Sequence, residues 1–385
     1  MQADSLASFP APDATSAEHS RRCAEHIRNR IAAAGGSISF AEYMHEALYA
    51  PGLGYYAAGA ARFGEAGDFV TAPEVSPLFG NVIARQCAAV LDTVGGGILE
   101  FGAGSGRLAA DVLMKLDELG ALPDAYSILE ISPDLTERQQ QTLAREIPGL
   151  VSRVNWLTAL PDGFDGVVLA NEVLDALPVE RFVRRKDVRQ LRVTCDGVDF
   201  RIEEAPAPEV LAVEVERIES ALGAPLADGY VSEVSLGLQG WISDMLACLS
   251  DGMALLFDYG VRRHEYYARD RSDGWLRCHF RHRAHSNPLI LPGIQDITAW
   301  VDFSAAKDAA AGAEIAGYVT QAAFLLAGGL DRELRGMARL PAEQQIELSA
   351  QVKKLTLPGE MGEHFKCLGL SKGPLVNLDA FGANR

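Results

Sequence analysis

The chain has 385 residues, of which 48% are hydrophobic and 23% charged, and 35 Lys and Arg against 52 Asp and Glu give a net charge of −17. This composition supplies a large hydrophobic core and excludes a chain that is disordered throughout. The acidic balance argues against nucleic acid or an anionic membrane as the main partner, because both require dense positive charge.

The six cysteines occur singly, without a C-x-x-C pair. This pattern predicts neither a disulfide framework nor a structural zinc site, and it favours a reducing, cytoplasmic compartment. Residues 1–20 are rich in Ala, Ser and Pro and contain no Lys or Arg. We expect a disordered tail there and no targeting segment. The longest apolar neighbourhood, 315–330, contains Tyr, Thr and Gln and is too short for membrane insertion.

Residues 21–80 predict N-terminal helices followed by a covering loop. One helix is expected from Ser16 to Ala34, and a second over 37–48, where Ser39 and Glu42 form a capping box. Residues 50–80 are dense in Gly, Pro and aromatics, which indicates an ordered functional loop.

From residue 77 onward, helices and short apolar strands alternate, which is typical of a doubly wound α/β fold with a mainly parallel sheet. We expect helices over 77–91, 108–119, 134–146 and 234–249, and strands over 97–101, 126–131, 166–171, 253–258 and 365–370. A β-hairpin with its turn at Asp196-Gly197 interrupts this pattern. The predicted organisation is a core over 81–260 with the hairpin insertion near 179–204, a loop and helical insertion over 261–356 with helices at about 298–328 and 331–353, and closing strands over 357–385.

Glycines occupy positions 102, 104 and 106 of ILEFGAGSGR (98–107), directly after a strand and before a helix. Backbone can approach a ligand closely at such a turn, where helix N–H groups converge. A dinucleotide fingerprint would need glycine at Arg107, and no G-K-[ST] marks a P-loop. The turn instead resembles the acidic-x-Gly-x-Gly-x-Gly pattern of class I S-adenosylmethionine-dependent methyltransferases. Glu130 ends the next strand, where a carboxylate can accept hydrogen bonds from ribose hydroxyls.

Several longer segments strengthen this resemblance. They are GDFVTAPEVSPLFG (67–80), ANEVLDALPVERF (170–182), FDYG (257–260), RHRAHSNPLILPGIQDITAWVDF (281–303) and LPGEMGEHFKCLGL (357–370). Together they are similar to the MidA-like family of methyltransferases, whose mitochondrial member is an arginine methyltransferase that assists assembly of respiratory complex I. The chain departs from the family at Trp300, where histidine is expected, and at Ala103, where proline is expected.

The resemblance implies a class I, Rossmann-like fold with a seven-stranded sheet in the order 3-2-1-4-5-7-6. It further implies S-adenosyl-L-methionine as cofactor, S-adenosyl-L-homocysteine as product, and a protein arginine as methyl acceptor. The protein substrate suggested in this way is a complex I subunit. A homodimer is left open.

The residues expected to bind the cofactor follow the family motifs and the ends of the strands. Asn171 is assigned to the methionine end of the cofactor, Trp156 to stacking beside the adenine, and the segment from Thr71 to Ser76 to a lid. The full set is Glu100, Gly102, Ala103, Gly104, Gly106, Glu130, Ile131, Trp156, Asn171, Thr71, Pro73 and Ser76. A capping role is the alternative for Ser76, and core packing for Trp156.

Methyl transfer is an in-line displacement, so catalysis consists mostly of aligning donor and acceptor. Carboxylates can clamp a guanidinium and leave one nitrogen free to attack. Glu172 is the first candidate for this role and Asp175 the second, with an N-cap or turn role as the alternative for Asp175. Glu74 is a candidate partner of the cofactor ammonium or the acceptor, and Asp258 a candidate lining residue of the acceptor cleft.

His279, His282 and His285 stand near Cys278, but their spacing is unusual for zinc and Arg281 and Arg283 lie between them. We therefore expect no metal and interpret this stretch as a docking loop. Two alternatives to a protein methyltransferase remain: a cofactor-binding assembly or chaperone module with little turnover, and a small-molecule methyltransferase.

Overall fold

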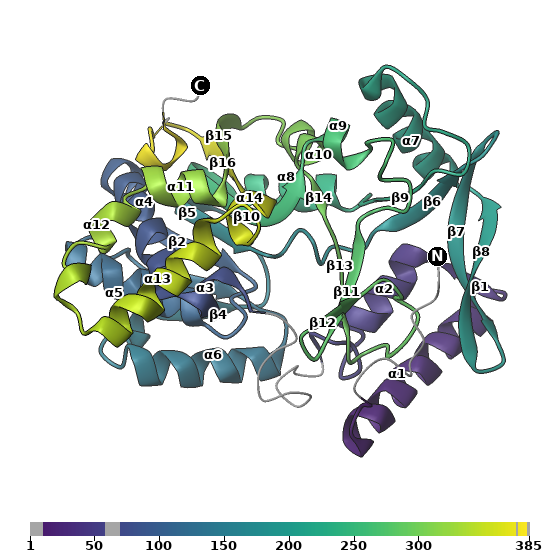
Figure 1. The fold of residues 1–385 in the computed structure, drawn as a ribbon, viewed down its shortest axis with the longest axis horizontal. Helices are drawn as coiled ribbons and strands as arrows, with labels where there is room; N and C mark the ends of the chain where they lie inside the picture. Colours follow the sequence, from purple (N-terminus) through teal and green to yellow (C-terminus); the bar gives the residue numbers. More distant parts are fainter. Residues whose placement is uncertain (1–10, 58–69, 375, 383–385) are drawn as a thin grey trace. The chain divides into compact units, whose positions relative to one another are not determined.

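The computed structural model describes residues 11–57, 70–374 and 376–382. The chain forms two compact units, each assembled from several segments (Figure 1). The N-terminal unit comprises Met1–Phe69, Leu174–Leu238 and Val261–Ala305. The core unit comprises Val70–Val173, Gln239–Gly260 and Ala306–Arg385.

The core unit is built on a twisted sheet in the order β15-β16-β10-β5-β2-β3-β4. Its strands are β2 (Gly97–Phe101), β3 (Tyr126–Leu129), β4 (Val154–Leu157), β5 (Phe164–Asn171), β10 (Leu249–Val261), β15 (Glu314–Thr320) and β16 (Phe365–Lys372). All neighbours pair in parallel except β16, which is antiparallel to both β10 and β15. Numbered along the chain, the order is 3-2-1-4-5-7-6, which confirms the expected class I sheet.

The helices of the core unit match the sequence analysis at 77–91, 108–119, 134–146 and 234–249, where helices were expected. They are α3 (Ala72–Val75), α4 (Pro77–Val94), α5 (Arg107–Leu119), α6 (Pro133–Glu146), α8 (Leu238–Cys248), α11 (Gln321–Ala327), α12 (Leu330–Glu333), α13 (Ala342–Thr356) and α14 (Met361–His364), with 3-10 turns at Val151–Arg153, Met337–Arg339 and Asp379–Phe381. Helices α4 and α5 cross so closely that a Cβ at Gly80 would lie 2.6 Å from the Asp111 Cβ. Their buried faces join the sheet in one apolar cluster that includes Phe79, Ile98 and Phe257.

Two predictions for the C-terminal part were wrong. The expected helix over 298–328 is divided among β13 (Asp296–Ala299), β14 (Val301–Asp302), α10 (Phe303–Ala309), β15 and α11. Strand β15 pairs with β16 at the sheet edge, and its β-branched and aromatic residues Ile315, Tyr318 and Val319 favour that pairing. The expected helix over 331–353 breaks at Gly336, which adopts a left-handed φ of 92°, and resumes as α13.

The N-terminal unit begins with helix α1 (Ala14–Ala33), whose start corrects the expected tail. The Asp13 Oδ1 atom accepts a hydrogen bond from the backbone N–H of Ser16, so the helix is capped at residue 13 and residues 14–20 belong to it. The capping box of Ser39 and Glu42 is confirmed, with reciprocal bonds of 3.1 and 2.8 Å. Helix α2 (Phe40–Tyr49) starts later than predicted because β1 (Ser37–Ser39) pairs with β7.

Two small sheets complete this unit. The predicted hairpin is confirmed as β7 (Val188–Asp196) and β8 (Asp199–Pro206), and it joins β1, β6 (Glu180–Arg184) and β9 (Val231–Val234) in one sheet. A second sheet has the order β12-β11-β13, with β11 at Leu276–Phe280 and β12 at Arg283–His285. Helices α7 (Glu209–Leu222) and α9 (Arg263–Tyr266) complete the element set. Trp300, the departure from the family pattern, stacks on Trp275 at 4.3 Å between ring centroids.

Candidate cofactor site

The glycine turn lies between the end of β2 and the start of α5. Gly102, Gly104 and Gly106 have φ values of 59°, 53° and 83°, a left-handed conformation that L side chains rarely adopt. A Cβ built on Gly104 meets no atom within 4 Å, whereas one on Gly106 would lie 3.2 Å from the Gln139 Cα. Gly106 therefore serves packing against α6, and Gly104 borders open space that a ligand can enter.

Glu130 follows β3 and is 8% exposed. Its Oε1 atom accepts from the backbone N–H of Ser132 at 2.9 Å and its Oε2 from the Gln139 Nε2 at 3.0 Å. Burial raises the pKa of Glu130. A carboxylate oxygen has two lone pairs, so both atoms keep capacity for the ribose hydroxyls.

Gln139 is the residue of this site that the sequence did not reveal. It lies on α6 and is fully buried. Besides Glu130, its Nε2 donates to the Gly104 carbonyl at 3.2 Å, and its Oε1 accepts from the Trp156 indole N–H at 3.0 Å. One side chain thus holds the glycine turn, the predicted ribose carboxylate and the predicted adenine neighbour. Gln139 begins the run Gln-Gln-Gln, so nothing in its local sequence marks it.

Trp156 lies within strand β4. Its indole is fixed by Gln139 and its side chain packs partly against the apolar cluster of the core unit. Ile131, next to Glu130, is 72% exposed. A large apolar side chain exposed beside the predicted ribose-binding carboxylate fits contact with a flat ring such as adenine.

Asn171 and Glu172 stand where β5 ends. The Asn171 Nδ2 donates to the Glu172 Oε1 at 3.2 Å, and the Glu172 backbone N–H donates to the Phe257 carbonyl at 2.9 Å. Glu172 has a positive φ of 55°, which is rare outside glycine. Among the residues that the structure describes, the buried Oδ1 of Asn171 finds no hydrogen-bond partner. An acceptor left unsatisfied in this way is costly, and a ligand ammonium would satisfy it.

Glu100 lies inside β2, beneath the glycine turn. It is 2% exposed and accepts a hydrogen bond of 2.8 Å from the Tyr126 hydroxyl. Burial raises the pKa of Glu100 to about 7. Glu100 therefore lies in the strand that leads directly into the glycine turn. Its direct contact with a cofactor stays a prediction.

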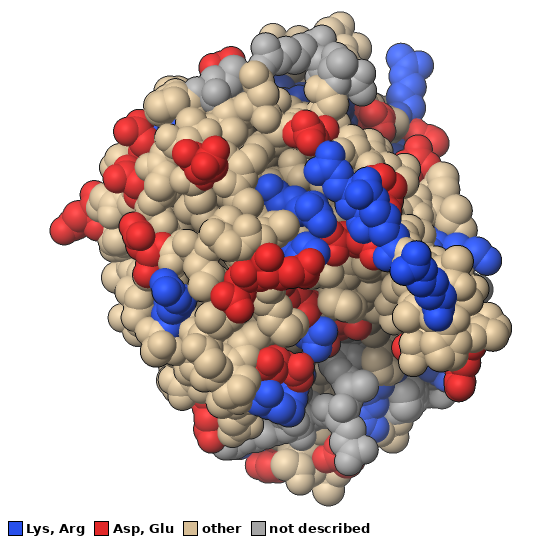
Figure 2. Space-filling view, turned by 90° about the vertical axis from the view of Figure 1, so that its left-hand side faces the viewer, with Lys and Arg blue, Asp and Glu red and all other residues tan. Residues whose placement is uncertain are grey.

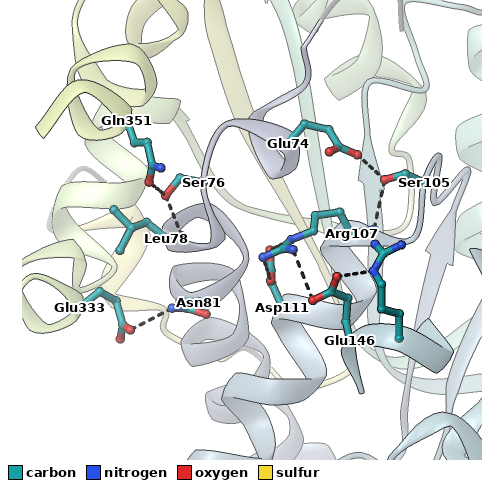
Figure 3. A network of polar contacts seen from close by, with 11 residues as sticks. Glu74, Ser76, Leu78, Asn81, Ser105, Arg107, Asp111, Glu146, Glu333 and Gln351 are labelled. Atoms are coloured by element: carbon teal, nitrogen blue, oxygen red, sulfur yellow. Dashed lines mark hydrogen bonds and ion pairs between the residues drawn. The ribbon is translucent and has the colours of Figure 1, made fainter. Parts of the chain in front are cut away.

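The predicted lid is a short helix, α3, over the glycine turn (Figure 3). The Glu74 carboxylate accepts from the Ser105 hydroxyl of that turn. Ser76 instead has the capping role that the sequence left open, since its hydroxyl accepts from the Leu78 N–H at 3.3 Å and donates to the Gln351 Oε1 at 2.7 Å. Thr71 precedes α3 as its N-cap, with no side-chain capping hydrogen bond within the described segments, and Pro73 is buried. Positions 58–69 of the expected loop lie outside the described residues.

Arg107 occupies the position where a dinucleotide fingerprint needs glycine. Its Nε donates to the Asp111 Oδ2 at 3.0 Å, and its Nη1 lies 3.8 Å from a Glu146 oxygen (Figure 3). Burial raises the pKa of Asp111 to about 6, and the neighbouring guanidinium opposes that rise. Arg107 is therefore engaged by carboxylates of its own unit.

The predicted catalytic carboxylates are distributed over both units. Glu74, Glu172 and Asp258 belong to the core unit and Asp175 to the N-terminal unit. Asp258 is fully buried in β10, and its Oδ1 accepts from the Tyr259 backbone N–H at 2.9 Å. Asp175 is 2% exposed, and its carbonyl accepts from the Ala299 N–H at 3.0 Å.

The surface carries both charges despite the acidic total. In Figure 2 acidic and basic side chains stand side by side rather than forming one patch of a single sign. In the described parts of the chain, no group of three or more His, Cys, Asp and Glu could hold a metal ion. Within the same residues, no helix is long and apolar enough to cross a membrane.

Comparison with known proteins decides the family. Residues 82–319 match a family model described as "Putative S-adenosyl-L-methionine-dependent methyltransferase". The chain belongs to this methyltransferase family. The mitochondrial protein arginine methyltransferase NDUFAF7 of Mus musculus is 31% identical over 90% of this chain and 83% of its own length. The Drosophila melanogaster homologue is 30% identical over 93% and 87%.

A solved structure supports the fold and the cofactor of this methyltransferase. The crystal structure of a Burkholderia thailandensis protein bound to S-adenosyl-homocysteine is 41% identical, covers 98% of both chains and superposes with a TM-score of 0.91. The expected class I fold and the expected cofactor, S-adenosyl-L-methionine, are thereby confirmed. The residues present fit that cofactor, because open space at Gly104, spare acceptor capacity on Glu130 and the unsatisfied Asn171 oxygen match its hydroxyl and ammonium donors.

Proposed function

We propose that this methyltransferase acts on the guanidinium of a protein arginine. The relatives named above are protein arginine methyltransferases. The observation that carries the proposal is Glu172, a half-buried carboxylate held at the end of β5 by Asn171 and by an unusual backbone conformation. A fixed carboxylate at this strand end can bind two guanidinium N–H groups side by side. By the family resemblance, the protein substrate is a subunit of respiratory complex I.

In the proposed mechanism the cofactor supplies a methyl group activated by its sulfonium charge. The glycine turn and Glu130 bind its sugar side, and the Asn171 oxygen accepts from its ammonium group. Glu172 clamps the acceptor guanidinium, so that one nitrogen faces the methyl group. The guanidinium nitrogen would take the methyl group that the bound cofactor supplies, which would leave S-adenosyl-L-homocysteine, and it would release one proton to water. Glu74 and Asp258, which belong to the same unit as Glu172, are proposed to line the acceptor side, and Asp175 stays the second candidate for contact with the acceptor.

Replacement of the clamp tests the proposed acceptor. Glu172→Gln should leave affinity for S-adenosyl-homocysteine unchanged and lower methyl transfer to protein arginine at least about tenfold, since a charge-assisted hydrogen bond contributes about 1.5–3 kcal/mol. Calorimetry measures the first quantity and mass spectrometry of methylated arginine the second. The exposed Glu137→Gln is the control. Unchanged transfer by Glu172→Gln would remove this residue from the mechanism.

The same assay separates the alternatives. Cofactor binding without methylation of any acceptor would indicate an assembly module, and methylation of low-molecular-weight acceptors alone would indicate a small-molecule enzyme. We also propose a cytoplasmic location, which fractionation of cells would test. Whether the protein forms a homodimer is a separate question, and the mass of the protein in solution answers it.

A further inference from the structure

A cavity of about 290 Å³ lies within the N-terminal unit, formed by β6, β11 and the turn between α9 and β11. Six polar residues that line it carry the argument: Arg181, Asp270, Arg271, Asp273, Arg277 and Ser286. None of them belongs to the cofactor site. The volume is at the lower end of ligand pockets, which suits a single side chain or a small ion.

Arg181 is a buried arginine in the lining of this cavity. It is 9% exposed, and only its Nε atom is used, in a 3.1 Å bond to the Glu233 Oε1. Glu233 is fully buried and its Oε2 accepts from the Trp275 N–H at 2.8 Å, so this carboxylate is occupied on both oxygens. The two terminal nitrogens of Arg181 form no hydrogen bond to any residue that the structure describes. Arg181 lines the cavity, so its two terminal nitrogens can donate to an acceptor that enters there.

Two more arginines stand at the same cavity without a carboxylate partner in the described chain. Arg271 lies over the Trp275 ring at 4.2 Å from its centroid, which fixes its position without using its N–H donors. Arg277 donates one Nη1 bond to the Leu276 carbonyl at 2.9 Å. The cavity thus gathers cationic donors in a chain whose net charge is −17.

We propose that this cavity binds a carboxylate, supplied by an acidic side chain of the protein acceptor. A planar carboxylate matches the paired N–H groups of arginine. Asp270 and Asp273 line the same cavity and repel a doubly charged anion more strongly than a singly charged one, which favours a carboxylate over phosphate. Only the source of the carboxylate rests on the proposed function, since the binding itself requires no methyl transfer.

The test uses the full chain and a blocked pentapeptide, acetyl-Ala-Ala-Glu-Ala-Ala-amide, with its Gln counterpart and inorganic phosphate as comparison ligands. Titration followed by NMR should show saturable binding of the Glu peptide, at least about tenfold weaker binding of the Gln peptide, and weaker binding of phosphate. Arg181→Lys and Arg277→Gln should each weaken the Glu peptide by about tenfold. Arg269→Gln, exposed in the same turn but outside the cavity lining, should not.

Arg181→Lys keeps a cation beside Glu233. Arg277→Gln changes only an exposed side chain, so we expect this second variant to fold. Equal binding of the Glu and Gln peptides, or no effect of Arg277→Gln, would overturn the carboxylate site while leaving the methyltransferase proposal intact. Conversely, selective Glu binding without any arginine methylation would count against the proposed function alone.

Discussion

The buried carboxylate of Glu100, next to the glycine turn, should make the free energy of unfolding depend on pH. In the unfolded chain its pKa is near 4.5, and burial raises it to about 7 in the folded protein. Between these values the folded state binds more protons than the unfolded state, so the free energy of unfolding falls as pH rises. The decrease attributable to Glu100 is about 3 kcal/mol, completed near pH 7.

Glu100→Gln removes this titration and keeps an acceptor for the Tyr126 hydroxyl. Denaturant unfolding of the cofactor-free protein should therefore depend less on pH between about 5 and 7, and the variant should be at least as stable as wild type at pH 8. The exposed Glu347→Gln should retain the wild-type profile. A Glu100→Gln profile parallel to wild type would show that this carboxyl does not titrate in that range.

Gly104 and Gly120 allow the role of the turn to be tested with matched substitutions. Both have a positive φ, 53° and 67°, and a Cβ on either meets no atom within 4 Å. Ala at either position should therefore lower the free energy of unfolding by a similar amount, about 1–2 kcal/mol. Only Gly104 borders the proposed cofactor space. Gly104→Ala should weaken S-adenosyl-homocysteine at least about tenfold by calorimetry, a loss of about 1.4 kcal/mol. Equal affinities of the two variants would contradict this placement.

At the scale of elements, α6 organises the site through Gln139. Its amide connects the glycine turn, the loop after β3 and strand β4, which are separate along the chain. A leucine of similar size cannot replace these bonds, and it leaves the Trp156 N–H without its acceptor. Local geometry at the ends of three sheet strands therefore depends on one helix residue.

Gln139→Leu should lower the free energy of unfolding by about 1–3 kcal/mol and weaken S-adenosyl-homocysteine by about tenfold or more. Gln141→Leu, exposed on the same helix, should change neither quantity appreciably. Trp156 emission should shift in Gln139→Leu alone, because its indole loses a polar partner. Cofactor affinity that is equal in both variants would confine Gln139 to a packing role.

For the whole molecule, the proposed placement of the cofactor in the core unit predicts where binding stabilises the chain. With ligand at about a hundred times its Kd, stabilisation approaches roughly 2.7 kcal/mol. Hydrogen exchange should slow over 100–107 and 130–139 and remain unchanged in the β7–β8 hairpin of the N-terminal unit. Protection confined to the hairpin would place the cofactor elsewhere.

The sequence by itself determined the features that depend on short-range pattern. Apolar runs ending in glycine located β2 and its turn, the Ser39–Glu42 box located α2, and Asp196-Gly197 located the hairpin. The family resemblance added the strand order and the cofactor. These features are encoded within a few neighbouring positions, so they can be read without knowing the fold.

Only the tertiary structure decided what depends on distant partners. Strand β15 is a strand because β16, far along the chain, pairs with it, and Gln139 differs from the next two glutamines only through its neighbours in space. The donors of Arg181 likewise face a cavity whose walls come from separate segments. Such roles arise from burial and hydrogen-bond geometry between remote residues, which local sequence does not specify.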